Sequence, residues 1–309
     1  MSSPGVGHEY SADVSWEKRD ILLFAISIGC TSQDELHFLY ENHPNFAAFP
    51  TFPIVFTYKG NTSEVTDFYE VQGSNSIPGV PKLDWTRMVD GQRMMQFLKP
   101  LPTTSVGRQF ALRTKVIGAY DKGKPGTVIE TEQSLVDKQT GEVYTRAIGS
   151  AFFMGQGGWG GPKGPSAINY PPPRGRENSP DEVSELQMTA DSAHLYRLNG
   201  DYNPLHATPE PGKKMGFGGT IMHGLYSWNA SAYLLLKTLG QSDPANMKEF
   251  QARFAAPVKP GSKLVVKMWK TGEVKDGFRE IRFVTEVNNK VVLSNGRALI
   301  RMADGKSKL

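Results

Sequence analysis

The stretch from Leu225 to Gly240, LYSWNASAYLLLKTLG, has the spacing of a buried α-helix. Its apolar side chains recur at alternating steps of three and four, at Leu225, Trp228, Ala232, Leu235 and Leu239. The other faces are apolar too, with Tyr226, Tyr233, Leu234 and Leu236, and Gly240 is placed to end the helix. We therefore expect a helix that protein encloses on nearly every side.

Segments with the alternation of β-strands follow this helix at 263–270, 279–287 and 291–302. In the middle segment one face carries Ile281, Phe283, Thr285 and Val287, and the other carries Glu280, Arg282 and Glu286. Asn288-Asn289-Lys290 marks a tight turn before the last segment. An antiparallel sheet wrapped round one helix is the hot-dog arrangement, which we predict for this half.

The first half of the chain repeats the strand pattern at 109–119, 127–136 and 143–154, with a turn at Lys138-Gln139-Thr140-Gly141. Two such copies predict an α+β double hot-dog fold. No stretch of the first half has comparable apolar helical character. Its helix should therefore be missing or shortened, which would leave an internal space.

Glycine and proline crowd the middle of the chain, from Gly155 to Pro173, and exclude a helix or a central strand there. We expect an N-terminal repeat at 1–154, a linker at 155–182, a C-terminal catalytic repeat at 183–302 and a tail at 303–309. A phosphate-binding loop is the other interpretation of these glycines. It is less favoured, because no Gly-Lys-Ser/Thr ending and no strand-loop-helix context accompany them.

The composition is that of an ordinary globular protein, with 309 residues, 39% hydrophobic and 21% charged. The net charge of +4 is spread along the chain, which argues against a nucleic-acid surface but favours an anionic ligand. Cys30 is the only cysteine, so disulfides and cysteine-based zinc sites are excluded. The apolar run from Ile21 to Ile28 is too short to span a bilayer, and we expect no membrane association.

The segment 195–206, LYRLNGDYNPLH, carries the chemistry. It sets Asp201, Asn203 and His206 within six residues, where Gly200 and Pro204 prevent an ordinary helix. A carboxyl that donates a proton and an imidazole that accepts one can add or remove water across a polarised double bond. Capping of a turn is the other use of Asp201 and Asn203, and it is less favoured beside these histidines.

Together with Met222-His223-Gly224-Leu225, this segment resembles the signature of R-specific 2-enoyl-CoA hydratases, the MaoC-like hydratase 2 family, including the hydratase 2 domain of peroxisomal multifunctional enzyme type 2. The resemblance extends from about Ala25 to Met302, with supporting matches at Phe38-Leu39-Tyr40-Glu41, Phe49-Pro50-Thr51-Phe52, Lys99-Pro100-Leu101-Pro102 and Arg253-Phe254. It implies reversible hydration of trans-2-enoyl-CoA to (3R)-3-hydroxyacyl-CoA, without cofactor or metal, by a homodimer. A first-half space would then house a long or branched acyl chain.

Carried over by position, the resemblance implies that Asp201 is the acid, that His206 is the base and that Asn203 helps to hold the water. The backbone N–H of Gly224 would donate to the thioester oxygen, at the start of the predicted helix. His223 is expected to be structural, hydrogen-bonded in the core. A metal site of His194, His206 and His223 is not favoured, since no supporting carboxylate spacing appears.

The implied substrate contacts are Asp90, Gly91, Lys122 and Phe254, with Tyr202 inside the motif. Tyr202 should chiefly be a packing residue, and Lys122 is equally well explained as a solvated turn lysine. Asp90 departs from the family pattern, because the common eukaryotic members have histidine there. This difference leaves the contact, and the usual straight-chain substrate, open.

The chain ends in Ser307-Lys308-Leu309, the tripeptide that peroxisomal import receptors bind. We therefore expect a peroxisomal enzyme that engages such a receptor. A hot-dog thioesterase and a non-catalytic acyl-CoA-binding module remain the alternative functions; the combination of Asp201, His206 and Asn203 argues against both.

Overall fold

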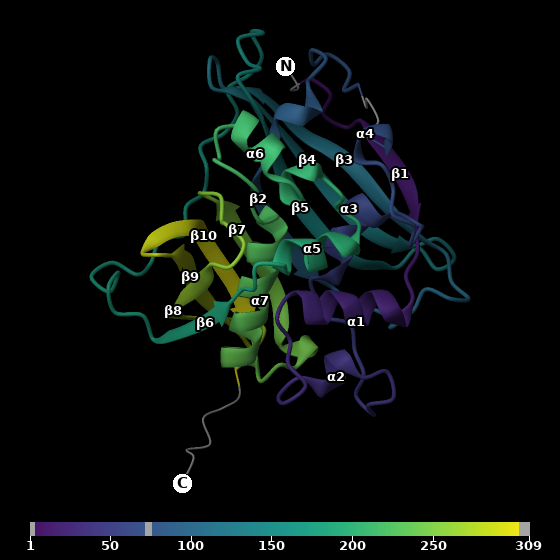
Figure 1. The fold of residues 1–309 in the computed structure, drawn as a ribbon, viewed down its shortest axis with the longest axis vertical. Helices are drawn as coiled ribbons and strands as arrows, with labels where there is room; N and C mark the ends of the chain where they lie inside the picture. Colours follow the sequence, from purple (N-terminus) through teal and green to yellow (C-terminus); the bar gives the residue numbers. More distant parts are fainter. Residues whose placement is uncertain (1–3, 72–75, 303–309) are drawn as a thin grey trace.

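The computed structural model describes residues 4–71 and 76–302, which form one ten-stranded antiparallel sheet with helices on its concave side (Figure 1). The strand order is β1-β3-β4-β5-β2-β7-β10-β9-β8-β6. The strands are β1 (Glu9–Val14), β2 (Met88–Phe97), β3 (Phe110–Asp121), β4 (Gly126–Asp137), β5 (Val143–Met154), β6 (Glu182–Gln187), β7 (Met247–Phe254), β8 (Lys263–Lys275), β9 (Phe278–Val287) and β10 (Lys290–Ile300).

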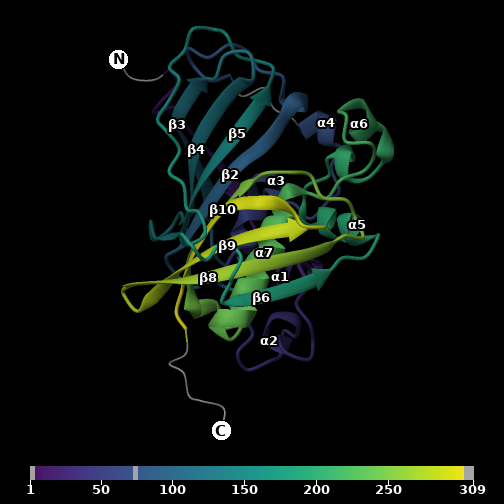
Figure 2. The same ribbon diagram turned by 90° about the vertical axis from the view of Figure 1, so that its left-hand side faces the viewer.

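Each half of the chain supplies five neighbouring strands, and the halves join where β2 pairs with β7 (Figure 2). The register across this joint runs from Gln92 opposite Arg253 to Gln96 opposite Glu249. All six segments predicted as strands lie in the sheet, so the double hot-dog fold is confirmed. The two joining strands, β2 and β7, were not among the predicted strand segments.

The predicted core helix is α7 (Gly224–Gly240), which packs against β6, β7, β8 and β10. Fourteen of its seventeen residues are buried, so it is enclosed on nearly every side, as expected. The left-handed residue that ends the helix is Gln241, with φ 56°, and not Gly240. A side chain at Gly240 would come within 2.7 Å of the terminal methyl group of Leu236, so Leu236 would have to shift.

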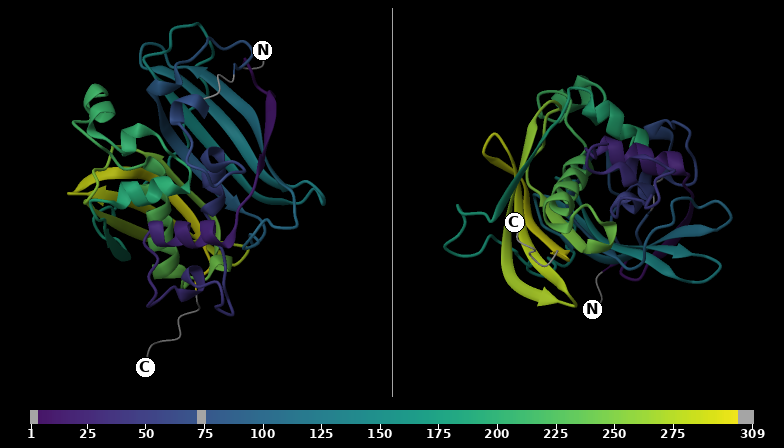
Figure 3. Two further views of the ribbon diagram at one scale, coloured as in Figure 1. Left: turned by 45° about the vertical axis from the view of Figure 1, so that its right-hand side comes forward. Right: turned by 90° about the horizontal axis from the view of Figure 1, so that it is seen from below.

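The first half has no equivalent of α7 among its described residues. Its short helical pieces are α1 (Lys18–Ser27), α2 (Leu36–Leu39), η1 (Phe52–Val55), α3 (Phe56–Lys59), α4 (Phe68–Val71) and η2 (Trp85–Arg87). The longest of them, α1, makes its main contacts with α2 and with second-half helices, not with the first-half sheet (Figure 3). The predicted reduction of the first-half helix is therefore confirmed.

The glycine-rich segment at 155–182 carries no helix or strand until β6 begins at Glu182. The carboxylate of Asp121 accepts hydrogen bonds from the N–H groups of Gly158 and Gly160, at 2.7 and 2.8 Å. These donors are therefore occupied, which argues further against a phosphate-binding loop. Within the described ranges, no helix is both long and apolar enough to cross a membrane. The predicted targeting tripeptide lies outside the described residues.

Candidate active site

The segment predicted to carry the chemistry forms a tight turn between two short helical pieces. It begins in the last residues of α5 (Ser192–Tyr196), continues through η3 (Arg197–Asn199), turns at Gly200 and ends in η4 (Pro204–His206), before α6 (Pro209–Lys214). Gly200 has a left-handed φ of 115°, and a side chain there would lie 2.7 Å from the backbone of Lys59. Only glycine fits this position, which brings the turn down onto the end of α3.

Asp201 and Asn203 hold the shape of this turn. Oδ1 of Asp201 accepts the N–H of Asn203 at 3.2 Å, and Oδ1 of Asn203 accepts the N–H of Leu205 at 3.0 Å. The two side chains therefore do cap the turn, as the alternative interpretation of the sequence expected. Both side chains also line a cavity, so the two roles coexist.

His206 is presented to the same cavity as a neutral base. Its Nδ1–H donates to the carbonyl of Ile221 at 3.0 Å, because a carbonyl can only accept. This bond fixes the tautomer and leaves Nε2 free to accept a proton. Burial lowers the pKa of His206 to about 4, so the ring is uncharged at neutral pH.

The environment shifts the pKa of Asp201 in the opposite direction to that of His206. Burial raises the pKa of its carboxyl to about 7; the N–H of Asn203 partly opposes this rise, and the charge of Asp90 adds to it. The Asp201 carboxyl can therefore hold a proton near neutral pH, which an ordinary aspartate does not. Opposed pKa shifts in neighbouring groups are the arrangement that assigns one group as acid and the other as base.

His223 positions both groups. Its Nε2–H donates to the backbone carbonyl of Asp201 at 3.0 Å, and its ring lies against that of His206, with centroids 3.9 Å apart. Its Nδ1 is buried without a partner among the described residues. The hydrogen bond in the core was expected, and it ties the catalytic turn to the start of α7.

Gly224 is the first residue of α7, so its N–H has no partner within the helix and belongs to the positive end of the helix dipole. The ring of Phe254 packs over its Cα, and a side chain at this position would lie 3.1 Å from that ring. The position can therefore offer an N–H to a closely approaching oxygen.

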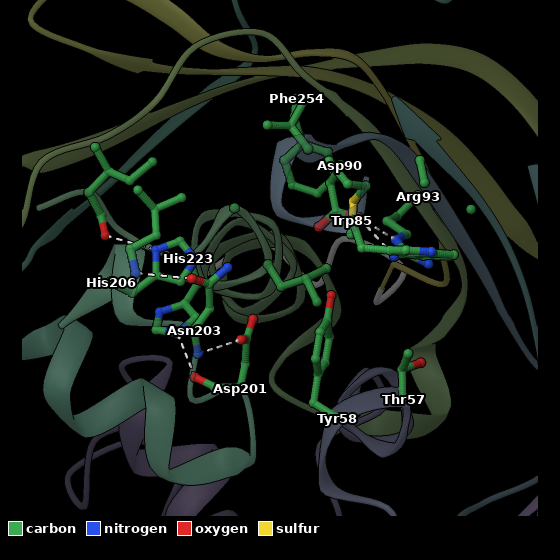
Figure 4. A pocket seen from close by; sticks show the side chains of 18 of the residues that line it. Thr57, Tyr58, Trp85, Asp90, Arg93, Asp201, Asn203, His206, His223 and Phe254 are labelled. Atoms are coloured by element: carbon green, nitrogen blue, oxygen red, sulfur yellow. Dashed lines mark hydrogen bonds and ion pairs between the residues drawn. The ribbon is translucent and has the colours of Figure 1, made fainter. Parts of the chain in front are cut away.

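A cavity of about 670 Å³ joins these groups and lies between the two halves (Figure 4). Its lining includes Asp201, Tyr202, Asn203, His206, Gly224, Asp90 and Phe254. Tyr202 is mostly packed, with the guanidinium of Arg197 5.1 Å from its ring centre. Seven of the nine predicted site residues thus share one cavity.

Gly91 and Lys122 do not line this cavity. Gly91 occupies a β-bulge in β2, next to Asp90. Lys122 lies in the turn after β3, where its ammonium hydrogen-bonds to the carbonyl of Lys163 and lies 5.1 Å from the ring centre of Tyr120. Their contacts with a substrate remain predictions.

Asp201, His206 and His223 are the described residues that could hold a metal ion. One carboxylate oxygen of Asp201 and one ring nitrogen of each histidine lie within 4.8 Å of one another, so a carboxylate accompanies the histidines, contrary to the expectation from the sequence. His194 is exposed and does not belong to this group. In both histidines of the group one ring nitrogen is already bonded to a backbone carbonyl, which leaves the other ring nitrogen of each as the only one available to a metal or a substrate.

Many side chains of the cavity were missed from the sequence, among them Tyr58, Trp85 and Arg93. They come from the first half, more than a hundred residues before the catalytic turn. Nothing in the local spacing of these residues links them to Asp201. The only sequence signal for a functional role of these residues is the position of a charged side chain, Arg93, within a strand.

Two family models match the chain, one described as MFE-2 hydratase 2 N-terminal domain over residues 14–155 and one as MaoC like domain over residues 175–292. The chain is 51% identical over 301 residues to the "Probable dehydratase NIT22" of Ajellomyces capsulatus, covering 94% of this chain and 80% of that protein. It is 31% identical over 295 residues to the "Enoyl-CoA hydratase 2, peroxisomal" of Arabidopsis thaliana, covering 91% and 89%. The crystal structure of a MaoC-like dehydratase from Phytophthora capsici superposes with a TM-score of 0.81 at 30% identity, covering 98% and 97%.

Proposed function

The chain belongs to the MaoC-like hydratase 2 family, and from that membership we propose that it catalyses the reversible hydration of trans-2-enoyl-CoA to (3R)-3-hydroxyacyl-CoA in peroxisomes. The observation that carries this proposal is the pairing of Asp201 with His206. The two groups lie within 4.8 Å in one cavity and have pKa values shifted in opposite directions.

The reaction needs the thioester oxygen to take up negative charge while water attacks C3. The N–H of Gly224 donates to that oxygen, and a donor of this kind typically contributes about a hundred- to a thousand-fold in rate. Nε2 of His206 takes a proton from the attacking water, which Asn203 helps to hold. Protonated Asp201 then delivers its proton to C2, and each of these transfers contributes about a hundred- to ten-thousand-fold.

Acid and base lie on one wall of the cavity, so both parts of the water molecule reach the same face of the double bond. In the reverse direction Asp201 removes the C2 proton and His206 protonates the departing hydroxyl. No step requires a redox change or a further co-reactant.

A crotonyl-CoA assay tests the proposal against the alternative functions. Loss of the ultraviolet absorbance of the enoyl thioester without release of free CoA supports a hydratase. Release of free CoA would instead identify a thioesterase, and no turnover would leave a binding module. Asp201→Asn and His206→Gln should each abolish hydration, whereas His194→Gln, at an exposed histidine outside the cavity, should not.

Peroxisomal location rests on the terminal tripeptide and on the peroxisomal relative from Arabidopsis. The full chain fused behind a fluorescent protein should enter peroxisomes through the import receptor, and deletion of Leu309 should leave it in the cytosol. Import that survives this deletion would remove the targeting proposal. A homodimer is expected from the family, and light scattering during gel filtration measures it directly.

A further inference from the structure

Two charged residues of β2 point into the cavity although they stand three positions apart. In a regular strand, residues i and i+3 face opposite sides of the sheet. Here the register shifts between Asp90, opposite Ala151, and Gln92, opposite Ser150, so that Gly91 is an extra residue. This bulge brings Asp90 and Arg93 to the same face, which is the usual way in which a bulge redirects a side chain.

The guanidinium of Arg93 is built into the cavity wall. Its Nε and Nη2 donate to Oδ1 of Asp90 at 3.1 and 2.8 Å, and only 9% of the residue is exposed. Gly149 lies opposite Arg93 on β5, and any side chain there would collide with Nη1. The wall thus accommodates this ion pair even though burial of charges is costly.

Arg93 is part of a larger polar surface on the inner face of the first-half sheet. The register places Arg93 beside Gly149 and then Thr131, and places Gln133 beside Thr114 and then Tyr10. We call the side chains of Tyr10, Arg93, Thr114, Thr131 and Gln133 the polar strip; all five line the cavity. Its members also bond to each other, with Nε2 of Gln133 3.4 Å from the Thr114 hydroxyl.

The second half shows what this face looks like when a helix covers it. There β8 buries Leu264, Val266 and Met268 in one core with the side chains of α7. The first half lacks the helix and carries polar groups in its place, beside apolar ones such as Leu112 and Ile129. An unsubstituted alkyl chain would desolvate these polar groups and offer no partner for their remaining hydrogen-bonding capacity, which is unfavourable.

Two hydrogen-bond donors at the cavity, Nη1 of Arg93 and the hydroxyl of Tyr58, have no partner within the described part of the chain. The hydrogen bonds of the Arg93 side chain to Asp90 use only Nε and Nη2, which leaves Nη1 available. The hydroxyl of Tyr58 points into the cavity between Asp201 and the Asp90–Arg93 pair (Figure 4), and burial raises its pKa well above the usual value, so it stays a neutral donor. The ion pair is neutral overall, which favours an uncharged acceptor over a carboxylate.

We propose that the acyl group of the substrate carries hydroxyl or carbonyl oxygens, and that the polar strip binds them with Tyr58. This inference rests on the proposed hydratase function and narrows its substrate class to oxygenated enoyl-CoA thioesters. The apolar lining contacts the carbon skeleton, and the polar strip selects the substituents.

Matched pairs of trans-2-enoyl-CoA substrates test this inference, one with a plain alkyl tail and one of equal length with a hydroxyl group at the tail end, at several lengths. We expect the oxygenated member of at least one pair to have a kcat/KM roughly ten- to a hundred-fold higher. In the double variant Asp90→Leu/Arg93→Met, which leaves no unpaired charge, this ratio should fall toward one. Arg108→Met removes a first-half ion pair outside the cavity and should leave the ratio unchanged.

The possible results distinguish failure of the proposed hydratase function from failure of the substrate inference. If the wild type hydrates neither member of any pair, the proposed function fails. If it hydrates plain substrates equally well or better at every length, only the substrate inference fails. If the double variant loses activity equally on both members while its unfolding temperature is unchanged, the ion pair contacts the CoA part common to both, and the inference is overturned as well.

Discussion

Replacement of Asp201 by asparagine should abolish activity and at the same time stabilise the folded protein above neutral pH. The carboxyl is held under the catalytic turn, where burial raises its pKa from 3.8 to about 7. Asparagine has the same shape and still accepts the N–H of Asn203, but it never ionises. The variant therefore removes the charge while it keeps the contacts of the turn.

The sign and size of the effect follow from the two pKa values. An unfolded chain releases the proton near 3.8 and the folded chain near 7, so the folded state holds the extra proton between these values. Wild-type stability should therefore fall as pH rises from about 4 to about 7, and stay lower above. The full shift is worth about 4 kcal/mol at 1.36 kcal/mol per pKa unit. Because Asp201 is partly open to the cavity, screening reduces the expected gain of the variant to about 1–2 kcal/mol.

Urea unfolding of the wild type and Asp201→Asn at about pH 4 and about pH 8 measures this difference. Asp137→Asn is the matched control of opposite sign. Burial alone would raise the pKa of Asp137, but the N–H groups of Gln139 and Thr140 and the guanidinium of Arg108 together lower it, so this variant should lose stability at the higher pH. If Asp201→Asn were no more stable than the wild type at about pH 8, Asp201 would be ionised in the folded protein and unsuited to act as the acid.

Three further predictions concern the active site. Both directions of the reaction require a single proton shared by Asp201 and His206, so kcat/KM should follow a bell with limbs near pH 4 and pH 7; a rate that is flat through pH 7 would exclude Asp201. Asp90→Asn removes a charge that raises the pKa of Asp201, and should move the alkaline limb to lower pH without moving the acid limb upward. Gly224→Ala puts a methyl group 3.1 Å from the Phe254 ring and beside the N–H donor, and should reduce kcat roughly tenfold or more in stopped assays; near-normal kcat would place the thioester oxygen elsewhere.

The elements that could be predicted from the sequence are those with undisturbed periodicity. The three middle strands of each half alternate cleanly, and α7 is apolar on nearly every face. The short edge strands β1 and β6 were not predicted. The joining strand β2 was missed because its bulge at Gly91 breaks the alternation and both of its faces are partly buried. Its partner β7 was not predicted as a strand, although Arg253-Phe254 lies at its end.

The site was predictable where its residues are close in sequence. Asp201, Asn203 and His206 share one turn, and Gly224 follows at the start of α7, so one short stretch of sequence contains the proposed reaction centre. Arg93 and Tyr58 are far from this turn in the sequence, and only the tertiary fold brings β2 and α3 to the same cavity. Lys122 was expected from the resemblance alone, and the structure places it in a turn that does not line the cavity.

The two hot-dog units contribute different parts of the site. The second unit has the core helix α7, and with it the free N–H groups of the helix start and the turn that holds Asp201 and His206. The described residues of the first unit include no such helix, so the inner face of its sheet is not packed against one and carries polar residues such as Arg93. Substitutions in the second half should therefore act chiefly on kcat, and those in the first half on the preference between substrates. Kinetics of Gln133→Leu on the paired plain and hydroxylated substrates test that division of roles, because Gln133 belongs to the polar strip and contacts Thr57 and Thr114 but none of the residues of the catalytic turn.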